Sequence, residues 1–349
     1  MDLGLFSEIL NIPSTSGEER ALAEFLSVRL AGPVEGFPQP AKCRVLKFEV
    51  GDGTENLLFD WSETGAPPFV YCTHLDTVPP YIPPTFTSEG SDTLIRGRGS
   101  CDAKGQIFAM YTVCRRLEVE GFHDFGLLLL AGEETGSFGA KAWTRDCPGG
   151  DFVLVGEPTD NCLVTASKGT KAFAVTLHGT PCHSGYPENG ESAVDKFVAF
   201  MNMLSAVEFP LDPDLGPTTW NVGKLRSDNP QNILSPEVSF RLYFRTTFAS
   251  DSLILKALEG ICPAGTEVEA LGGDDPLHYF SEVPGIPGRP MAFGSDAPRL
   301  RHFARRAICG PGSILTAHTD REQVRLSELE TAVEQYIRIF KSVNNSKSI

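Results

Sequence analysis

The chain has 349 residues, of which 41% are hydrophobic and 21% charged, as in a folded globular protein and unlike a disordered one. A single hydrophobic core rarely serves a chain of this length, so two domains are expected. The formal net charge of -15 repels phosphate backbones and argues against nucleic-acid binding.

The first half of the chain alternates between strands and helices. The capping-box spacing of Ser16 and Glu19 predicts the start of a helix whose apolar face runs from Leu22 to Leu30. Further on, a helix is predicted from Gly105 to Leu117. Near-continuous apolar runs predict strands at 56–61, 68–73, 125–131 and 152–155. Such strands are buried on both faces, which indicates an α/β domain.

From about Lys171 the strands instead alternate apolar and polar residues. The predicted elements are a strand at 171–178, a helix at 192–206, strands at 218–225 and 238–247, a helix at 252–260 and a strand at 267–271. This order is the split βαβ, or ferredoxin-like, arrangement. A Gly/Pro-rich linker at 284–290 and a helix at 326–343 then return to the first domain. The sequence therefore predicts a domain of residues 1–168 and 280–349, with residues 169–279 inserted as a second domain.

The nine cysteines are scattered singly, without a CxxC pair. This spacing predicts reduced thiols in a cytoplasmic protein and neither a disulfide framework nor a thiolate zinc site. The N-terminus has no basic region followed by an apolar run, so no signal peptide is expected. No stretch has the apolar length that spans a bilayer, and we expect a soluble protein without membrane contact.

Acidic and histidine residues follow three of the predicted strands, and one more lies in a glycine-rich turn before a helix. They are His74 with Asp76, Glu133 with Glu134, Glu157, and Asp102. In an open α/β sheet, ligands bind outside the carboxyl ends of the strands. Each residue alone is more often part of a solvated loop, but so many carboxylates at one edge repel each other unless a dication holds them. Together they predict a divalent metal site.

The same stretches resemble the M20 family of metallopeptidases and deacylases, which includes acetylornithine deacetylase and succinyl-diaminopimelate desuccinylase. The matching stretches, in the order of the family, are 74–79, 97–105, 132–136, 156–159 and 316–318. The resemblance implies a zinc-peptidase-like catalytic domain with a mixed sheet flanked by helices. It also implies that the inserted ferredoxin-like domain is a lid through which a homodimer forms.

The resemblance also implies a metal centre. Asp102 would bridge two metal ions, with His74 and Glu157 holding one ion and Glu134 and His318 the other. Two imidazoles with carboxylates suit two Zn²⁺ ions, and Co²⁺ or Mn²⁺ are plausible substitutes.

By the same resemblance, Asp76 would orient the imidazole of His74, and Glu133 would be the general base. His183, in a turn of the inserted domain, would reach the oxyanion of the tetrahedral intermediate, often across a dimer. Asn232 and Arg245 would bind the carboxylate of the substrate. Gly294 and Ser295 resemble a substrate loop of the family, although a plain turn fits them nearly as well.

The implied reaction is hydrolysis of the amide bond of an N-acyl amino acid, with acetylornithine deacetylase, an enzyme of arginine biosynthesis, as the nearest activity. Three alternative functions differ in how well the sequence fits them. A dipeptidase or carboxypeptidase of the same family would use the same metal ligands and base. An inactive binding protein on the same scaffold is disfavoured, because all five ligands and the base are present. A nucleotide-binding enzyme is excluded, because the glycines near Gly99 have neither the GxGxxG nor the P-loop spacing.

Overall fold

The computed structural model describes residues 1–51 and 53–345 and divides into two compact units. The first unit comprises Met1–Thr165, Tyr279–Arg289 and Ser295–Ile349, and the second comprises Ala166–His278 and Pro290–Gly294. The sequence-based boundaries place the segment 290–294 in the first domain. It belongs instead to the second unit, where the backbone N–H of Lys168 donates to the carbonyl of Met291 at 3.1 Å.

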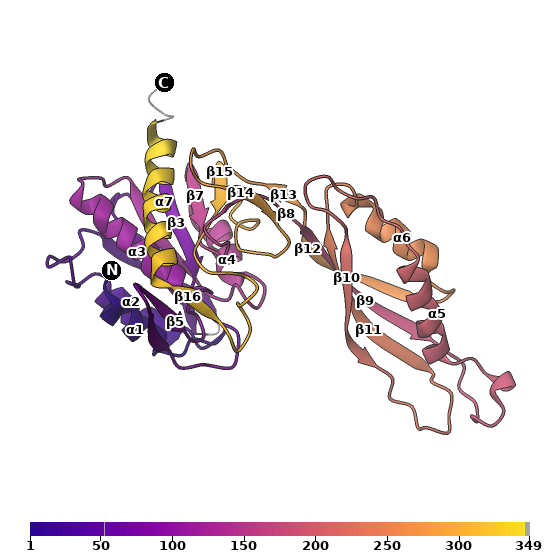
Figure 1. Cartoon of the computed structure of the whole chain (residues 1–349). Helices are drawn as coiled ribbons and strands as arrows, with labels where there is room; N and C mark the ends of the chain where they lie inside the picture. The colour runs from indigo at the N-terminus through magenta and orange to yellow at the C-terminus, as the bar shows by residue number, and fades with distance from the viewer. Residues whose placement is uncertain (52, 346–349) are drawn as a thin grey trace. The chain divides into compact units, whose positions relative to one another are not determined.

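A six-stranded mixed sheet forms the centre of the first unit (Figure 1). Its strands, in spatial order, are β1 (Arg44–Gly51), β2 (Thr54–Asp60), β6 (Phe125–Leu130), β3 (Phe69–His74), β7 (Phe152–Val155) and β15 (Arg305–Ile308). The strands β6, β3, β7 and β15 run parallel, whereas β1 and β2 are antiparallel to their neighbours. The four parallel strands therefore end at the same edge.

Helices cover both faces of this sheet. The strands β2, β3, β6 and β7 are therefore buried on both faces. The helices of the first unit are α1 (Leu3–Leu10), α2 (Arg20–Arg29), α3 (Lys104–Val119), α4 (Phe138–Asp146) and α7 (Leu326–Asn345). Helices α1, α2, α3 and α7 share one hydrophobic core with alternate residues of the strands, such as Phe69 and Tyr71. Helix α4 contacts β1 and β2, and the side chain of Asn56 on β2 donates to the carbonyl of Gly139 on α4 at 2.9 Å.

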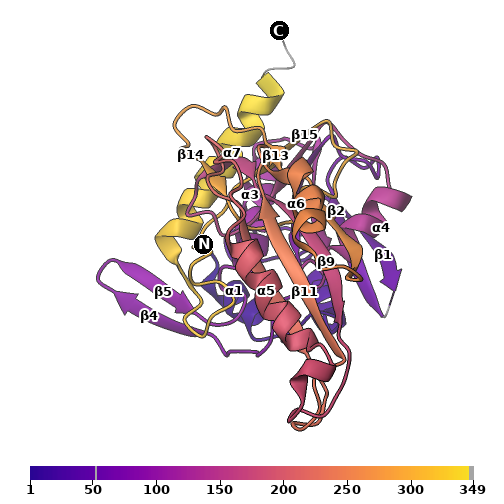
Figure 2. The same ribbon diagram turned by 90° about the vertical axis from the view of Figure 1, so that its right-hand side faces the viewer.

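Two further sheets have three strands each. A hairpin of β4 (Thr85–Glu89) and β5 (Asp92–Arg96) pairs with β16 (Gln323–Arg325), and Figure 2 shows it as a ribbon apart from the main sheet. The other sheet has the order β13-β8-β14, formed by Leu277–His278, Leu163–Ser167 and Gly288–Met291. Among the described residues, no helix is both long and apolar enough to cross a membrane.

The second unit has the predicted ferredoxin-like order. Its elements are β9 (Gly169–His178), α5 (Ala193–Ser205), β10 (Thr219–Arg226), β11 (Glu237–Thr246), α6 (Ile254–Ile261) and β12 (Glu267–Asp274). The antiparallel sheet has the order β10-β11-β9-β12. Inward side chains such as Phe240 and Phe244 on β11 form a second core with Phe200 on α5. The predicted α/β fold with an inserted βαββαβ domain is thus confirmed.

The capping box at Ser16 is wrong. Helix α2 begins at Arg20, and its N-cap residue Glu19 makes no side-chain capping bond. The hydroxyl of Ser16 instead donates to Oδ2 of Asp76 at 2.7 Å. The hydroxyl of Ser16 therefore bonds to the carboxylate of Asp76, which is remote in the sequence, and does not cap the helix.

Candidate metal centre

The ends of the parallel strands bring the predicted ligands together. His74 is the last residue of β3, Glu133 and Glu134 lie three and four residues beyond the end of β6, and Glu157 lies two residues beyond β7. Asp102 reaches the same edge from the turn that precedes α3. The topology therefore gathers these side chains from strands that neighbour each other in the sheet.

Two groups of three potential ligands share the carboxylate of Asp102. One group is His74, Asp102 and Glu157, and the other is Asp102, Glu134 and His318; within each, the ligand atoms lie within 4.8 Å of one another. The Oδ1 atom of Asp102 is 3.0 Å from Nε2 of His74, and its Oδ2 atom is 3.2 Å from Nε2 of His318. Asp102 thus faces one imidazole with each oxygen. We name these groups the His74 cluster and the His318 cluster.

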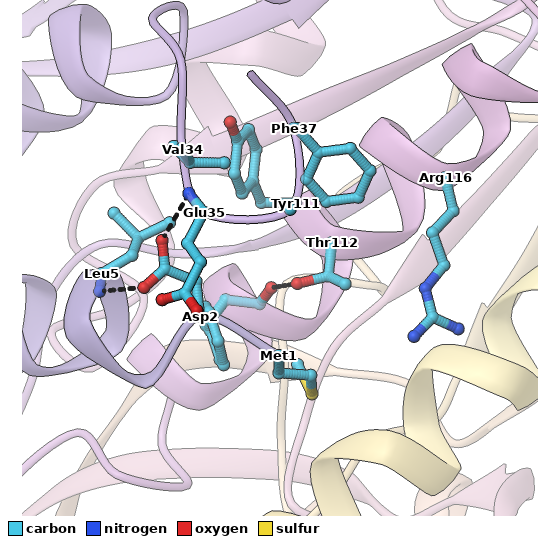
Figure 3. A pocket seen from close by; sticks show the side chains of 11 residues that line it. Met1, Asp2, Leu5, Val34, Glu35, Phe37, Tyr111, Thr112 and Arg116 are labelled. Carbon is cyan, nitrogen blue, oxygen red and sulfur yellow. Dashed lines mark hydrogen bonds between the residues drawn. The ribbon is translucent and has the colours of Figure 1, made fainter. Parts of the chain in front are cut away.

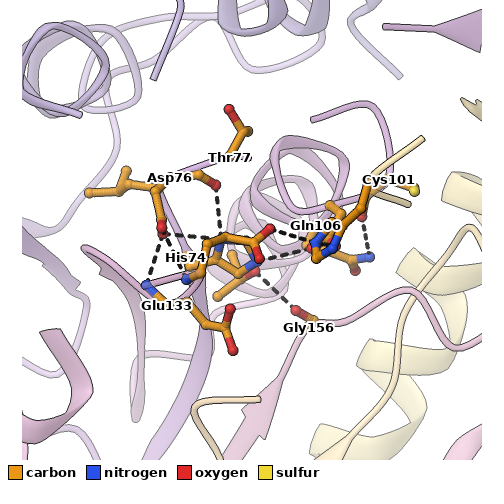
Figure 4. Close-up of polar contacts among 12 residues, drawn as sticks. His74, Asp76, Thr77, Cys101, Gln106, Glu133 and Gly156 are labelled. Carbon is orange, nitrogen blue, oxygen red and sulfur yellow. Dashed lines mark hydrogen bonds and ion pairs between the residues drawn. The ribbon is translucent and has the colours of Figure 1, made fainter. Parts of the chain in front are cut away.

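The hydrogen bonds of His74 determine which ring nitrogen can bind a cation (Figure 4). Its Nδ1 atom lies 2.9 Å from the backbone oxygen of Asp76, which can only accept, so Nδ1 is the donor. Nε2 therefore presents either a proton or a lone pair to Asp102. Burial acts to lower the pKa of His74, but hydrogen bonds with Asp102 and Asp76 outweigh it and hold that pKa well above its usual value.

His318 has the less usual backbone of the two histidines. Its φ is 62°, in the left-handed region, which a non-glycine residue adopts at a cost of about 1–2 kcal/mol. Its Nε2 atom lies 2.8 Å from Oε1 of Glu134, and hydrogen bonds with Asp102 and Glu134 raise the pKa of His318 to about 10. The ring is therefore held between two carboxylates.

Negative charge is concentrated and buried at this edge. Burial, followed by the charge of Glu133, raises the pKa of Glu157 well above its usual value, and one buried oxygen of Glu157 has no hydrogen-bond partner. Burial and the nearby carboxylates of Asp296 and Glu134 likewise raise the pKa of Glu133. A buried acceptor without a donor is rare in proteins and indicates a missing cation or water. The residues present therefore fit a pair of divalent metal ions that share Asp102.

The carboxylate of Asp76 ties several of these residues together. Its Oδ1 atom accepts the backbone N–H of Glu133 at 3.0 Å and lies 3.3 Å from Nδ1 of His74. Its Oδ2 atom accepts the backbone N–H of Glu134 at 3.1 Å and the hydroxyl of Ser16 at 2.7 Å. Asp76 therefore fixes both the imidazole of one cluster and the loop that carries the acidic pair.

The sequence analysis assigned no role at this centre to several buried polar residues that surround it. Asp296 is 1% exposed, one of its oxygens has no hydrogen-bond partner, and burial raises its pKa to about 7. Arg98 and Glu322 form a buried ion pair, and Ser16 holds Asp76. A single charged residue in a loop carries no periodic signal, so only the three-dimensional contacts identify these residues.

The remaining predicted site residues lie mostly in the second unit. His183 and Asn232 are exposed and come together: the backbone N–H of Ser184 donates to the carbonyl of Asn232 at 2.9 Å. Arg245 lies near the other end of β11, with its guanidinium 5.1 Å from the centre of the Tyr243 ring.

Gly294 and Ser295 fall on either side of the division between the units. A Cβ built on Gly294 would lie 3.7 Å from Nη1 of Arg245, so this residue borders the arginine. Ser295 is buried, and its hydroxyl accepts the backbone N–H of Ala297 at 3.3 Å, as in a turn.

A separate cavity of about 250 Å³ contains none of the predicted site residues (Figure 3). It is lined from α1, α3 and the loop around Glu35. The carboxylate of Asp2 in its wall accepts the backbone N–H groups of Leu5 and Glu35, at 2.9 and 3.0 Å. Asp2, one of the two acidic residues in the lining, is thus bonded to the backbone, and the His74 and His318 clusters remain the candidate site.

Comparisons with known proteins agree with this geometry. Residues 70–342 match the peptidase family M20/M25/M40. A protein of Aspergillus fumigatus named "Probable carboxypeptidase" is 30% identical over 378 residues, which cover 97% of this chain and 86% of that protein. A protein of Emericella nidulans, also named "Probable carboxypeptidase", is 29% identical over 379 residues, which cover 97% of this chain and 88% of that protein. The chain therefore belongs to the M20/M25/M40 peptidase family and is a hydrolase of that family.

Solved structures show the same fold. A tripeptidase from Staphylococcus aureus superimposes with a TM-score of 0.75 at 19% identity, covering 98% of this chain and 97% of that one. An M20 family metallo-carboxypeptidase from Sulfolobus solfataricus gives a TM-score of 0.68 at 14% identity, covering 97% and 98%. The relatives named here are peptidases, and none is an acetylornithine deacetylase.

Proposed function

We propose that the protein is a di-metal hydrolase that cleaves the amide bond of an N-acyl amino acid carrying a short acyl group, in a reaction like that of acetylornithine deacetylase. The observation that carries the proposal is the pair of three-residue clusters that share Asp102. His74, Asp102 and Glu157 would hold one metal ion, and Asp102, Glu134 and His318 the other. Zn²⁺ is the expected ion for this mixture of imidazoles and carboxylates, with Co²⁺ or Mn²⁺ as substitutes.

The residues of the chain divide the chemistry. The bound metals would supply Lewis acidity, which lowers the pKa of water and polarises the scissile carbonyl. The carboxylate of Glu133 lies within 4.8 Å of ligand atoms of His74 and Glu134, so it is placed to accept a proton from the attacking water. The same carboxyl then donates this proton to the nitrogen of the leaving amine. Asp76 keeps the imidazole of His74 and the backbone of Glu133 in place.

The second unit would supply substrate recognition. Arg245 would bind the carboxylate on the amino-acid part of the substrate, since a guanidinium fork matches that group. Gly294 leaves room beside this guanidinium. Asn232 would contribute to the same recognition, and His183 would stabilise the oxyanion that forms as the carbonyl is attacked.

A homodimer would reconcile the positions of His183 and Arg245. Asn232, beside His183, lies in the loop between β10 and β11, whereas Arg245 lies eight residues beyond Glu237, the first residue of β11. Eight residues of extended strand span about 26 Å. One substrate cannot contact both ends of this strand in one unit, so His183 and Asn232 would serve the site of a second copy, whose own Arg245 binds the carboxylate. Exposed apolar residues on α5, among them Val194 and Val198, would suit such a contact.

A carboxypeptidase or dipeptidase is the second candidate, favoured by the names of the relatives. It would use the same clusters, base and carboxylate recognition, and would differ only in accepting an aminoacyl group in place of a short acyl group.

The test is hydrolysis of a panel by zinc-loaded protein with and without chelator: N-acetylornithine, N-acetylcitrulline, N-succinyl-diaminopimelate and several dipeptides. Chelator-sensitive cleavage of an acyl-amino acid supports the first candidate, and cleavage of dipeptides alone supports the second. Less than one metal ion per chain, with no activity recovered on adding zinc, would identify an inactive binding protein.

A further inference from the structure

A buried ion pair connects two loops that carry potential metal ligands. Nη1 of Arg98 lies 2.5 Å from Oε2 of Glu322, and the two residues are 2% and 1% exposed. Taking both charges out of water is unfavourable, so a buried pair is weak evidence of a contribution to stability. Its contacts indicate what else it does.

The glutamate contacts the backbone of the shared ligand. Oε1 of Glu322 accepts the backbone N–H of Asp102 at 3.2 Å and that of Cys101 at 3.3 Å. These bonds fix the peptide from which the Asp102 side chain projects. Asp102 is one of three potential ligands in each cluster.

The arginine contacts the loop that contains His318. Its Nη1 atom donates to the carbonyl of Thr319 at 3.2 Å, while Nε donates to the carbonyl of Pro80 at 3.3 Å. Thr319 directly follows His318, whose backbone is left-handed. A strained conformation of this kind persists only where surrounding contacts determine it. Arg98 provides one such contact at the adjoining peptide.

We propose that the Arg98–Glu322 pair is a positioning device for the His318 cluster, setting its metal affinity by locking Asp102 and His318 relative to each other. This inference rests on the proposed metal centre. Two of the three ligands of the His318 cluster are adjacent to contacts of the pair, but only Asp102 in the His74 cluster is. His74 depends instead on Asp76, and Glu157 on the end of β7.

The substitution Arg98→Lys keeps the positive charge but removes the fork that serves Glu322, Thr319 and Pro80 together. Co²⁺ titrations followed by visible absorption would report the two metal affinities without any substrate. Loss of a supporting contact of this kind is expected to weaken the His318 cluster about 10–100-fold and to change the His74 cluster by less than about threefold.

The background variant His318→Ala assigns the affected cluster, because Arg98→Lys should have little effect once His318 is gone. Arg116→Lys is the matched control: Arg116 pairs with Glu334 at 2.5 Å on exposed surfaces of α3 and α7. Glu322→Gln keeps the size and an acceptor oxygen, and should show the same selective weakening if Arg98→Lys does not fold.

Equal weakening of both clusters in Arg98→Lys would overturn the inference, and so would unchanged affinities. An Arg98→Lys effect that persists in the His318→Ala background would overturn it as well. If the wild-type protein takes up no Co²⁺, the proposed metal centre itself is wrong. Two bound ions in the wild type together with an insensitive Arg98→Lys would instead reject only the positioning role.

Discussion

The carboxylate of Asp76 shows how one residue organises a site without being a ligand. It contacts the imidazole of His74, the backbone of Glu133 and Glu134, and the hydroxyl of Ser16. Each of these groups donates a hydrogen bond or carries a proton, which explains why the pKa of Asp76 lies below its usual value despite the opposing effect of burial. Asp76 is therefore expected to remain ionised.

The substitution Glu133→Gln tests the proposed base. Gln has nearly the same shape but cannot accept a proton, so we expect kcat to fall about 10²–10⁴-fold. The protein should fold and retain two metal ions per chain, as measured by elemental analysis beside kcat. Turnover close to that of the wild type would assign the base to another residue.

The substitution Ser16→Ala tests the hydrogen bond to Asp76. A bond to a charged group contributes about 1.5–3 kcal/mol, and its loss should loosen His74 and lower metal affinity about tenfold. The control is Ser27→Ala on α2, where the hydroxyl donates to the carbonyl of Glu24 at 2.8 Å within the helix. Isothermal titration with Zn²⁺ compares the two variants, and equal affinities would remove Ser16 from the site.

For single residues, the sequence predicted which side chains the strand ends bring together. It did not predict the residues that hold those side chains in place. His74 and Glu157 follow apolar strands, so their position could be inferred from the chain order. Ser16 and Glu322 contact the centre from loops remote in sequence, and nothing in their local spacing distinguishes them from solvated residues. Such contacts depend on tertiary packing.

Among the elements, the first turn of α4 holds the loop that carries Glu133 and Glu134. The backbone N–H of Gly139 donates to the carbonyl of Ala131 at 3.0 Å, and Asn56 bonds to both residues. A Cβ at position 139 would lie 2.3 Å from the oxygen of Ala131. Only a glycine permits this approach of helix to strand.

Gly139→Ala should therefore destabilise the protein by about 1–3 kcal/mol and displace the acidic pair, lowering metal affinity. Gly260→Ala on α6 is the matched control, because its Cβ would meet open space and should stabilise the helix by about 0.5 kcal/mol. Unfolding midpoints of both variants give the comparison. A Gly139→Ala variant as stable as Gly260→Ala would show that the backbone there yields easily.

Elements with strong periodicity were predicted and weaker ones were not. The apolar strands β3, β6 and β7 and the helix α3 appear where the sequence placed them. The hairpin of β4 and β5 was missed because β4 is exposed along its whole length and has no apolar alternation. Helices α1 and α4, of 8 and 9 residues, were missed as well, although α6, of 8 residues, was predicted.

For the whole molecule, the proposed dimer makes a prediction that no single copy can satisfy. Glu133→Gln and His183→Ala should each be nearly inactive alone. When the two are mixed and allowed to exchange subunits, each mixed dimer has one site with an intact base and an intact His183 from the other copy. Random pairing should restore about a quarter of wild-type activity. Separate and mixed samples are compared by initial rates.

No recovery, in a mixture whose subunit exchange is confirmed by differential labelling, would place His183 on the site of its own chain or outside the chemistry.

The inserted unit was readily predicted because its alternating strands are distinctive. Its association with a second copy depends instead on surface complementarity, which one sequence does not encode in any local pattern.

The ligands of the centre are spread from His74 to His318, on both sides of the inserted unit. During synthesis on the ribosome, the His318 cluster stays incomplete until the whole of the second unit has emerged. The carboxylates of the N-terminal part are thus made 161 residues or more before the imidazole of His318. An ion in the His318 cluster would therefore bind only after the inserted unit has been made, whereas the residues of the His74 cluster are all present once Glu157 has emerged.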